Sequence, residues 1–199
     1  MKKLILSILA SVFLLSSCST EKPVVTEETT TAAETEAPVY HEFVYTTEYP
    51  DGTFFESYDG KTWYEKTFDS EKPIMKSEPV EAPLIYIHAF SDNVYDLENA
   101  QVMISVYNKG VEESIGTSSC GGILYYCYDG EWDRAPYKEN VAWTSDFNSL
   151  WKGAHKSFNG FPTNSLETVN KGRYRYEVEY LVSGRGKEYY TCTFEYDIK

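Results

Sequence analysis

The residues of this chain that could carry out chemistry are few and scattered. The three histidines, His41, His88 and His155, lie in separate segments without the spacing of a metal-binding motif. No nucleophile elbow, phosphate-binding loop or dinucleotide-binding fingerprint occurs. Although the chain has 31 Asp and Glu residues, the sequence singles out no pair of them as a general acid and base. We therefore predict a protein that is not an enzyme and that needs no cofactor or metal.

The four cysteines are the next candidates for chemistry. Cys120 and Cys127 are seven residues apart on what reads as one strand, roughly 23 Å when extended, which is too far for a disulfide between them. A disulfide from either residue to Cys192 could form, with Cys127 and Cys192 as one candidate pair. Three reduced thiols are an equally open alternative. The fourth cysteine, Cys18, lies in a different setting.

Cys18 follows a stretch with the features of a secretory signal. Lys2 and Lys3 precede an apolar run from Leu4 to Leu15 that is too short to span a membrane. The residues Leu15-Ser16-Ser17-Cys18 resemble the lipobox of bacterial lipoproteins. The resemblance implies that a signal peptide, residues 1–17, is removed, that the Cys18 thiol carries diacylglycerol and that the new amino terminus is acylated, for example with palmitate. We expect a protein anchored by lipid on the extracellular face of the cell membrane, because two acyl chains give stable attachment.

Charge narrows the range of partners. Without residues 1–17 the chain has 16 basic and 31 acidic residues, a net charge of −15. Nucleic acids and anionic lipid head groups would be repelled by such a protein, so no nucleic-acid partner is expected. A cationic partner is compatible with this charge, and so is an acidic surface that serves solubility alone.

Composition divides the chain into four segments. Residues 1–17 are the signal peptide. Residues 18–40 hold the acylated cysteine and a Thr- and Glu-rich run with almost nothing to bury, which predicts a disordered tether. Residues 41–80 contain three strand-like runs separated by Pro-Asp-Gly and Asp-Gly turns, followed by a proline-containing connector over residues 69–83; they predict a small β-hairpin arm. Residues 81–199 form the main domain.

The second turn of the arm, Ser57 to Trp63, is similar to the Asp-box turn of sialidase-type propellers. The motif is one residue short and occurs once, whereas a propeller needs repeats around a ring. The sequence therefore favours an ordinary hairpin turn at this position.

The main domain reads as a series of strands. Residues 84–90, 101–107 and 123–128 are apolar or alternating runs, and residues 146–151 could form a helical turn. From Tyr174 to Val182 and from Tyr190 to Ile198, apolar and polar residues alternate around a Ser183–Lys187 loop, which predicts an antiparallel pair. Together with 18 tyrosines and 4 tryptophans, these features predict an all-β fold, an antiparallel β-sandwich of the immunoglobulin-like (Ig-like) type.

Residues 84–199 resemble the bacterial Ig-like domains of Gram-positive lipoproteins. The matching pieces are the Val102–Asn108 strand, the aromatic strand closed by Asp129-Gly130-Glu131-Trp132, and the run Asn170 to Arg175 that opens the penultimate strand. The resemblance implies that Tyr174 forms a tyrosine corner, in which its hydroxyl bonds to upstream backbone. Tyr176 stands where antibody domains have their second cysteine, so the disulfide of those domains is not expected.

These expectations predict a lipid-anchored cell-surface protein. Its Ig-like domain would serve as a non-enzymatic binding, adhesion or spacing module that meets an extracellular protein or glycan of unknown identity. The alternative is a carbohydrate-binding module in which exposed aromatic rings stack on sugars, with Trp63, Trp143 and Trp151 as the candidate residues. Exposure of those rings distinguishes the two hypotheses.

Overall fold

The computed structural model describes residues 39–69, 72–76, 78–117, 121–141 and 148–199. The chain divides into two compact units, Met1–Pro38 and Val39–Lys199, and every described residue belongs to the second. The described part contains thirteen strands and one short 3-10 helix, η1 (Thr163–Ser165). The predicted signal peptide and most of the predicted tether, up to residue 38, lie outside the described residues.

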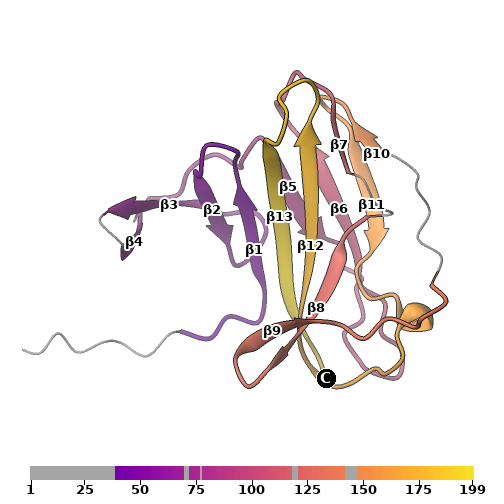
Figure 1. Ribbon diagram of the computed structural model, residues 1–199. Helices are drawn as coiled ribbons and strands as arrows, with labels where there is room; N and C mark the ends of the chain where they lie inside the picture. Colours follow the sequence, from indigo (N-terminus) through magenta and orange to yellow (C-terminus); the bar gives the residue numbers. More distant parts are fainter. Residues whose placement is uncertain (1–38, 70–71, 77, 118–120, 142–147) are drawn as a thin grey trace, which may run out of the picture. The chain divides into compact units, whose positions relative to one another are not determined.

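The larger of two antiparallel sheets contains ten strands (Figure 1). Eight of them form a continuous series in which each strand pairs with the next: β10 (Asn148–Leu150), β7 (Ile115–Thr117), β12 (Gly172–Val182), β13 (Tyr189–Ile198), β1 (Val44–Glu48), β2 (Phe54–Ser57), β3 (Tyr64–Asp69) and β4 (Lys72–Met75). The other two are β8 (Ile123–Tyr128), which also pairs with β12, and β9 (Glu131–Arg134), which pairs with β8. β12 and β13 are the longest strands and lie at the centre of this sheet.

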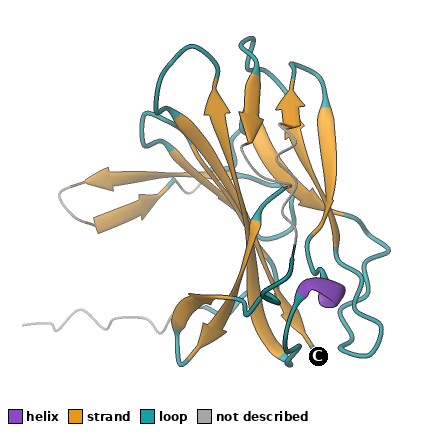
Figure 2. Cartoon of the chain, turned by 45° about the vertical axis from the view of Figure 1, so that its right-hand side comes forward, coloured by secondary structure: helices purple, strands orange, loops and turns teal. Residues whose placement is uncertain are grey.

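The smaller sheet packs against the larger one and has the strand order β11 (His155–Asn159), β6 (Met103–Asn108) and β5 (Ile85–Ala89). Figure 2 shows the two layers. Their facing sides hold fully buried apolar residues such as Ile87, Val106, Val178 and Phe194. The protein is therefore an Ig-like antiparallel β-sandwich, which confirms the fold class predicted from the sequence.

The C-terminal hairpin has the alternation that the sequence predicted. β12 and β13 pair from Gly172 opposite Ile198 to Leu181 opposite Tyr189. The side chains of Tyr176 and Val178 point into the core, as do those of Cys192 and Phe194 on the partner strand, and all four are buried. Because successive strand residues point to opposite faces, this apolar series fixes the register of the pair.

Tyr174 forms the predicted tyrosine corner. Its side chain is 2 % exposed, and its hydroxyl donates a hydrogen bond to the Asn170 carbonyl oxygen at 2.8 Å. The same hydroxyl accepts a hydrogen bond from the Asn170 backbone N–H at 3.2 Å. One side chain thus satisfies both backbone groups of a loop residue before β12 begins.

The N-terminal strands belong to the large sheet. β1 pairs antiparallel with β13 over five residues, from Val44 opposite Glu195 to Glu48 opposite Thr191. Tyr45 of β1 points inward, where its ring stacks on that of Phe194 with 4.6 Å between ring centroids. β2 and β3 continue the sheet as the meander that the Pro-Asp-Gly and Asp-Gly turns predicted.

Two local predictions were wrong. The connector over residues 69–83 contains a strand, β4, which pairs with β3 and carries Pro73; β4 is the edge strand of the sheet, where a residue without an N–H is tolerated. Asn148–Leu150 forms strand β10 rather than part of a helical turn, because it pairs with β7 and buries Leu150, which is 1 % exposed. Residues 142–147, just before β10, lie outside the described residues.

Candidate functional site

Cys18, the predicted lipidation site, lies outside the described residues. Within the described part of the chain, no helix has the length and apolar character needed to cross a membrane. Attachment to the membrane through Cys18 therefore stays a prediction from the sequence.

The candidate disulfide between Cys127 and Cys192 is not present, and both residues are free thiols. Cys192 is fully buried on the inner face of β13, opposite Val178. Cys127 is partly exposed, and it lies one residue beyond Tyr126, whose ring contacts the inward-pointing Tyr174. Because neighbouring strand residues point to opposite faces, Cys127 points away from the core and its thiol cannot reach Cys192. Cys120 lies outside the described residues.

The three tryptophans suggested for glycan stacking differ in where the structure places them. Trp63 is fully buried and its ring meets that of Tyr86 edge-on, with 6.0 Å between centroids. A stacking role for Trp63 does not fit this position, because no ring face is left for a sugar. Trp151 follows β10 and is 61 % exposed. Trp143 lies outside the described residues.

The turn before Trp63 is held together by the Asp59 carboxylate. Its Oδ1 accepts hydrogen bonds from the backbone N–H groups of Lys61 (2.8 Å) and Thr62 (2.7 Å), and its Oδ2 accepts one from the Thr62 hydroxyl at 2.9 Å. Partial burial alone would raise the pKa of Asp59, but these hydrogen bonds and one from Ser57 outweigh it and lower the pKa to about 2. The carboxylate therefore serves the turn itself and is not available as a proton donor.

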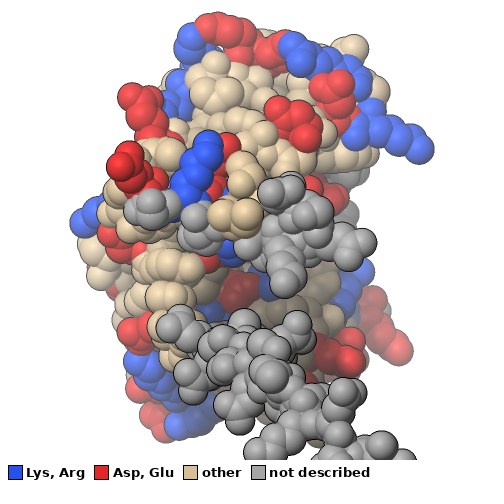
Figure 3. Space-filling view, turned by 90° about the vertical axis from the view of Figure 1, so that its left-hand side faces the viewer, with Lys and Arg blue, Asp and Glu red and all other residues tan. Residues whose placement is uncertain are grey.

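A group of charged residues on the outer face of β12 and β13 forms ion pairs. Arg173 forms ion pairs with Glu195 and Asp197, at 3.2 and 3.4 Å, and Arg175 forms one with Glu195 at 2.5 Å. The Arg175 guanidinium also lies 4.2 Å from the ring centroid of Trp132 and covers one face of that ring. Figure 3, which views the molecule from the side of β2 and β3, shows acidic and basic side chains interspersed over the surface.

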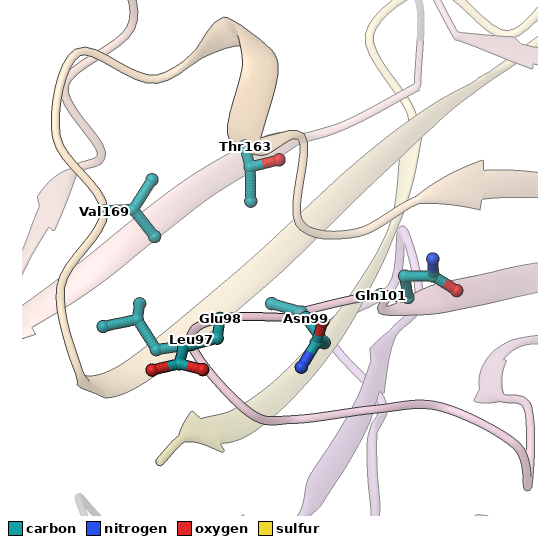
Figure 4. Close-up of a pocket in the computed structure, with 7 residues that line it drawn as sticks. Leu97, Glu98, Asn99, Gln101, Thr163 and Val169 are labelled. Atoms are coloured by element: carbon teal, nitrogen blue, oxygen red, sulfur yellow. The ribbon is translucent and has the colours of Figure 1, made fainter.

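A shallow depression of about 410 Å³ lies where the loop after β5 faces η1 (Figure 4). It is lined by Leu97, Glu98, Asn99, Ala100, Gln101, Thr163 and Val169. Glu98 is the one ionisable side chain in this lining. Asn99, Gln101 and Thr163 supply amide and hydroxyl groups, and the other three residues are aliphatic. The depression could form hydrogen bonds with a polar ligand, but it holds no acid–base pair and no nucleophile with an adjacent base.

Several of the strong pKa shifts in the described part of the chain belong to buried core residues. Burial raises the pKa of the Cys192 thiol to about 12 and raises that of Tyr196 well above its usual value. A thiol with so high a pKa is not a nucleophile. No group of His, Cys, Asp and Glu in this part of the chain is arranged to hold a metal ion.

Comparison of the chain with protein-family models, with curated proteins and with solved structures gives no match. The pairing of Trp132 with Arg175 was not predicted from the sequence. The only signal for it was the alternation of arginines along β12, which places them on the outer face.

Proposed function

We propose that this chain is a lipid-anchored cell-surface protein. Diacylglycerol on Cys18 holds it to the membrane, residues 18–40 serve as a tether, and the Ig-like sandwich acts as a non-enzymatic binding, adhesion or spacing module on the extracellular face. The observation that supports the proposal is the order of segments along the chain. A lipobox-like sequence ends at Cys18, and a compact unit begins at Val39. The region between them is too short and too polar for a second core.

The way in which the chain enters the sandwich suits a tethered module. Tyr40 lies at the start of the described residues, where its hydroxyl bonds to Asp197 and its ring lies 5.2 Å below the Arg173 guanidinium. Lys199, the last residue, forms an ion pair with Glu42 at 2.5 Å. The entry point therefore lies beside the C-terminal end of β13, while the β12–β13 loop lies at the opposite end of the hairpin (Figure 1).

The second candidate, a carbohydrate-binding module, has weaker support from the tryptophans than the sequence suggested. Trp63 is in the core, and Trp151 is the one candidate that the structure places on the surface.

Membrane attachment can be tested by expressing the full chain and its Cys18→Ala variant in a Gram-positive host. We expect the unsubstituted chain to partition with detergent and to be cut by protease added to intact cells. The Cys18→Ala variant should be absent from the detergent phase while retaining its fold. Equal partitioning of the two proteins would contradict the proposal, and so would protection of the unsubstituted chain from protease.

A further inference from the structure

A second depression, of about 310 Å³, lies at the end of the sandwich that carries the β1–β2 turn and the β12–β13 loop (Figure 1). Three segments far apart in the chain form it: the turn after β1, the segment before β7, and the β12–β13 loop with its flanking strand ends. The chain enters the sandwich at the opposite end of the β12–β13 hairpin, beside Lys199. We therefore call the depression the distal pocket, and it is lined by Tyr49, Pro50, Asp51, Glu113, Val182, Arg185, Glu188 and Tyr190.

The apolar part of this lining is held in place by the fold. Val182 is 3 % exposed and belongs to the core. The Tyr49 ring contacts the rings of Phe55 and Tyr190, with 4.9 and 5.3 Å between centroids. The Tyr49 hydroxyl accepts a hydrogen bond from the Leu84 N–H at 2.5 Å. Because these contacts order the lining before a ligand arrives, binding would cost little additional side-chain entropy.

The charged part of the lining is mainly acidic. Asp51, Glu113 and Glu188 supply three carboxylates and Arg185 one guanidinium, which gives a formal charge of −2. Arg185 forms ion pairs with Glu113 and, at 3.8 Å, with Glu188. Asp51 accepts a hydrogen bond from the Thr53 N–H at 2.9 Å. The side chains of Glu113 and Glu188 are 37 % and 46 % exposed, and Asp51 is exposed as well, so a solute can reach all three carboxylates.

The Tyr190 hydroxyl lies within the electric field of these groups. Burial raises the pKa of Tyr190, and the negative charges of Glu113, Asp51 and Glu188 raise it further, while Arg185 acts in the opposite direction. Tyr190 is itself only partly buried. Three carboxylates therefore act on one point of the pocket against a single guanidinium, and the resulting field favours a cation.

A lysine or arginine side chain matches both parts of the lining. Such a side chain joins an aliphatic stem to a charged head. The stem can pack on the tyrosine and valine side chains while the head meets the carboxylates. The pocket is at the lower end of the size range of small-ligand sites, which suits one side chain better than a larger molecule. Arg185 shows that a guanidinium can be held there, because Glu113 and Glu188 already pair with it.

The charge of the whole chain favours the same ligand. The net charge is −15 after removal of residues 1–17, and a charge of that sign attracts a basic protein and speeds its association. An anionic ligand would meet three carboxylates and a guanidinium that is already paired. The distal pocket is therefore a poor site for anions.

We propose that the distal pocket binds a lysine or arginine side chain of a basic extracellular protein. Asp51 and Glu113 pair with the ammonium or guanidinium group, the stem packs on Tyr49 and Tyr190, and Arg185 competes with the ligand for Glu113. This inference rests on the proposed function as a surface binding module, and it names the chemistry of the partner and the end of the sandwich that binds it.

The test is fluorescence anisotropy of short labelled peptides titrated with the full chain, purified in mild non-ionic detergent. The peptides consist of Gly and Ser, with two positions that hold Lys, Arg, Gln or Glu. We expect saturable binding of the lysine peptide, the arginine peptide or both, and none of the other two. Glu113→Gln and Asp51→Asn should each weaken it about fivefold, the effect of losing one exposed ion pair. Arg185→Ala should strengthen it by about the same factor, because Glu113 is then free to pair with the ligand.

Glu131→Gln is the matched control, because it removes the same charge from an exposed residue of β9, which lies toward the opposite end of the sandwich (Figure 1). Failure of both basic peptides to bind overturns the inference. A loss with Glu131→Gln as large as that with Glu113→Gln also overturns it, since net charge alone would then explain the attraction. Binding of the glutamate peptide that Arg185→Ala abolishes does so too, because the pocket would then take anions. Detergent partitioning of the same preparation reports separately on the lipid anchor, so failure of the proposed function is distinguishable.

Discussion

Replacing Tyr174 by Phe should destabilise the sandwich by removing one oxygen atom. The hydroxyl of this 2 %-exposed side chain is the partner of both the N–H and the C=O of Asn170. At about 1 kcal/mol for each hydrogen bond, the substitution should lower the free energy of unfolding by about 2 kcal/mol. For a folded unit of this size, that loss corresponds to a fall in Tm of roughly 4–8 °C. Urea unfolding followed by tyrosine and tryptophan fluorescence measures it.

Tyr180→Phe is the matched control. Tyr180 lies on the inner face of the same strand and is fully buried, but its hydroxyl has no hydrogen-bond partner among the described residues. Removing that hydroxyl should leave stability unchanged or raise it, because an unpaired buried polar group is lost. The error of such measurements is about 0.5 kcal/mol. If the free energies of unfolding of Tyr174→Phe and of the unsubstituted chain differed by less than this, the tyrosine corner would not be a stabilising element. Equal losses in the two variants would refute the reasoning as well.

Three further outcomes follow from the structure. Asp59→Ala should lower the free energy of unfolding by about 1 kcal/mol, a value reduced for the exposure of the turn. Folding lowers the pKa of Asp59 to about 2 from 3.8. Its contribution to stability should therefore be present above pH 4 and fade between pH 4 and 2 in urea titrations. Burial lowers the pKa of His88 below 6.5, so the free energy of unfolding should fall as the pH drops below 6.5, and His88→Phe should flatten this slope between pH 7 and 5. In the native protein a maleimide should modify the partly exposed Cys127 and leave the buried Cys192 untouched until urea unfolds the chain; native labelling at Cys192 would contradict the assigned core.

The fold could be predicted because its longest strands alternate strictly. From Tyr174 to Val182 and from Tyr190 to Ile198, every second residue is aromatic, aliphatic or cysteine, and that period of two determines both strand type and inward face. The turns of the N-terminal meander were also predictable, because glycine at positive φ, 83° at Gly52 and 68° at Gly60, marks tight reversals.

Short strands and surface pairings could not be predicted from local sequence. β10 has three residues and exists because it pairs with β7, about thirty positions away in the chain. β1 could be identified as a strand, but its pairing with β13 depends on contacts between the two ends of the folded unit.

The surface has the same limitation. The sequence drew attention to Trp63 because tryptophan is large and rare, yet tertiary packing buries that ring completely. The rings of Tyr86, Tyr107 and His155 stack on one another although they come from three strands, and only the register across the small sheet places them side by side.

The central claim, a surface module held by lipid on Cys18, is tested most directly by mass spectrometry of the N-terminal peptide. The peptide would be released by protease from the full chain purified out of a Gram-positive host. The account predicts that it begins at Cys18 and carries the mass of a diacylglycerol group on the cysteine. A peptide that begins at another residue, or one that begins at Cys18 with a free thiol, would contradict the account.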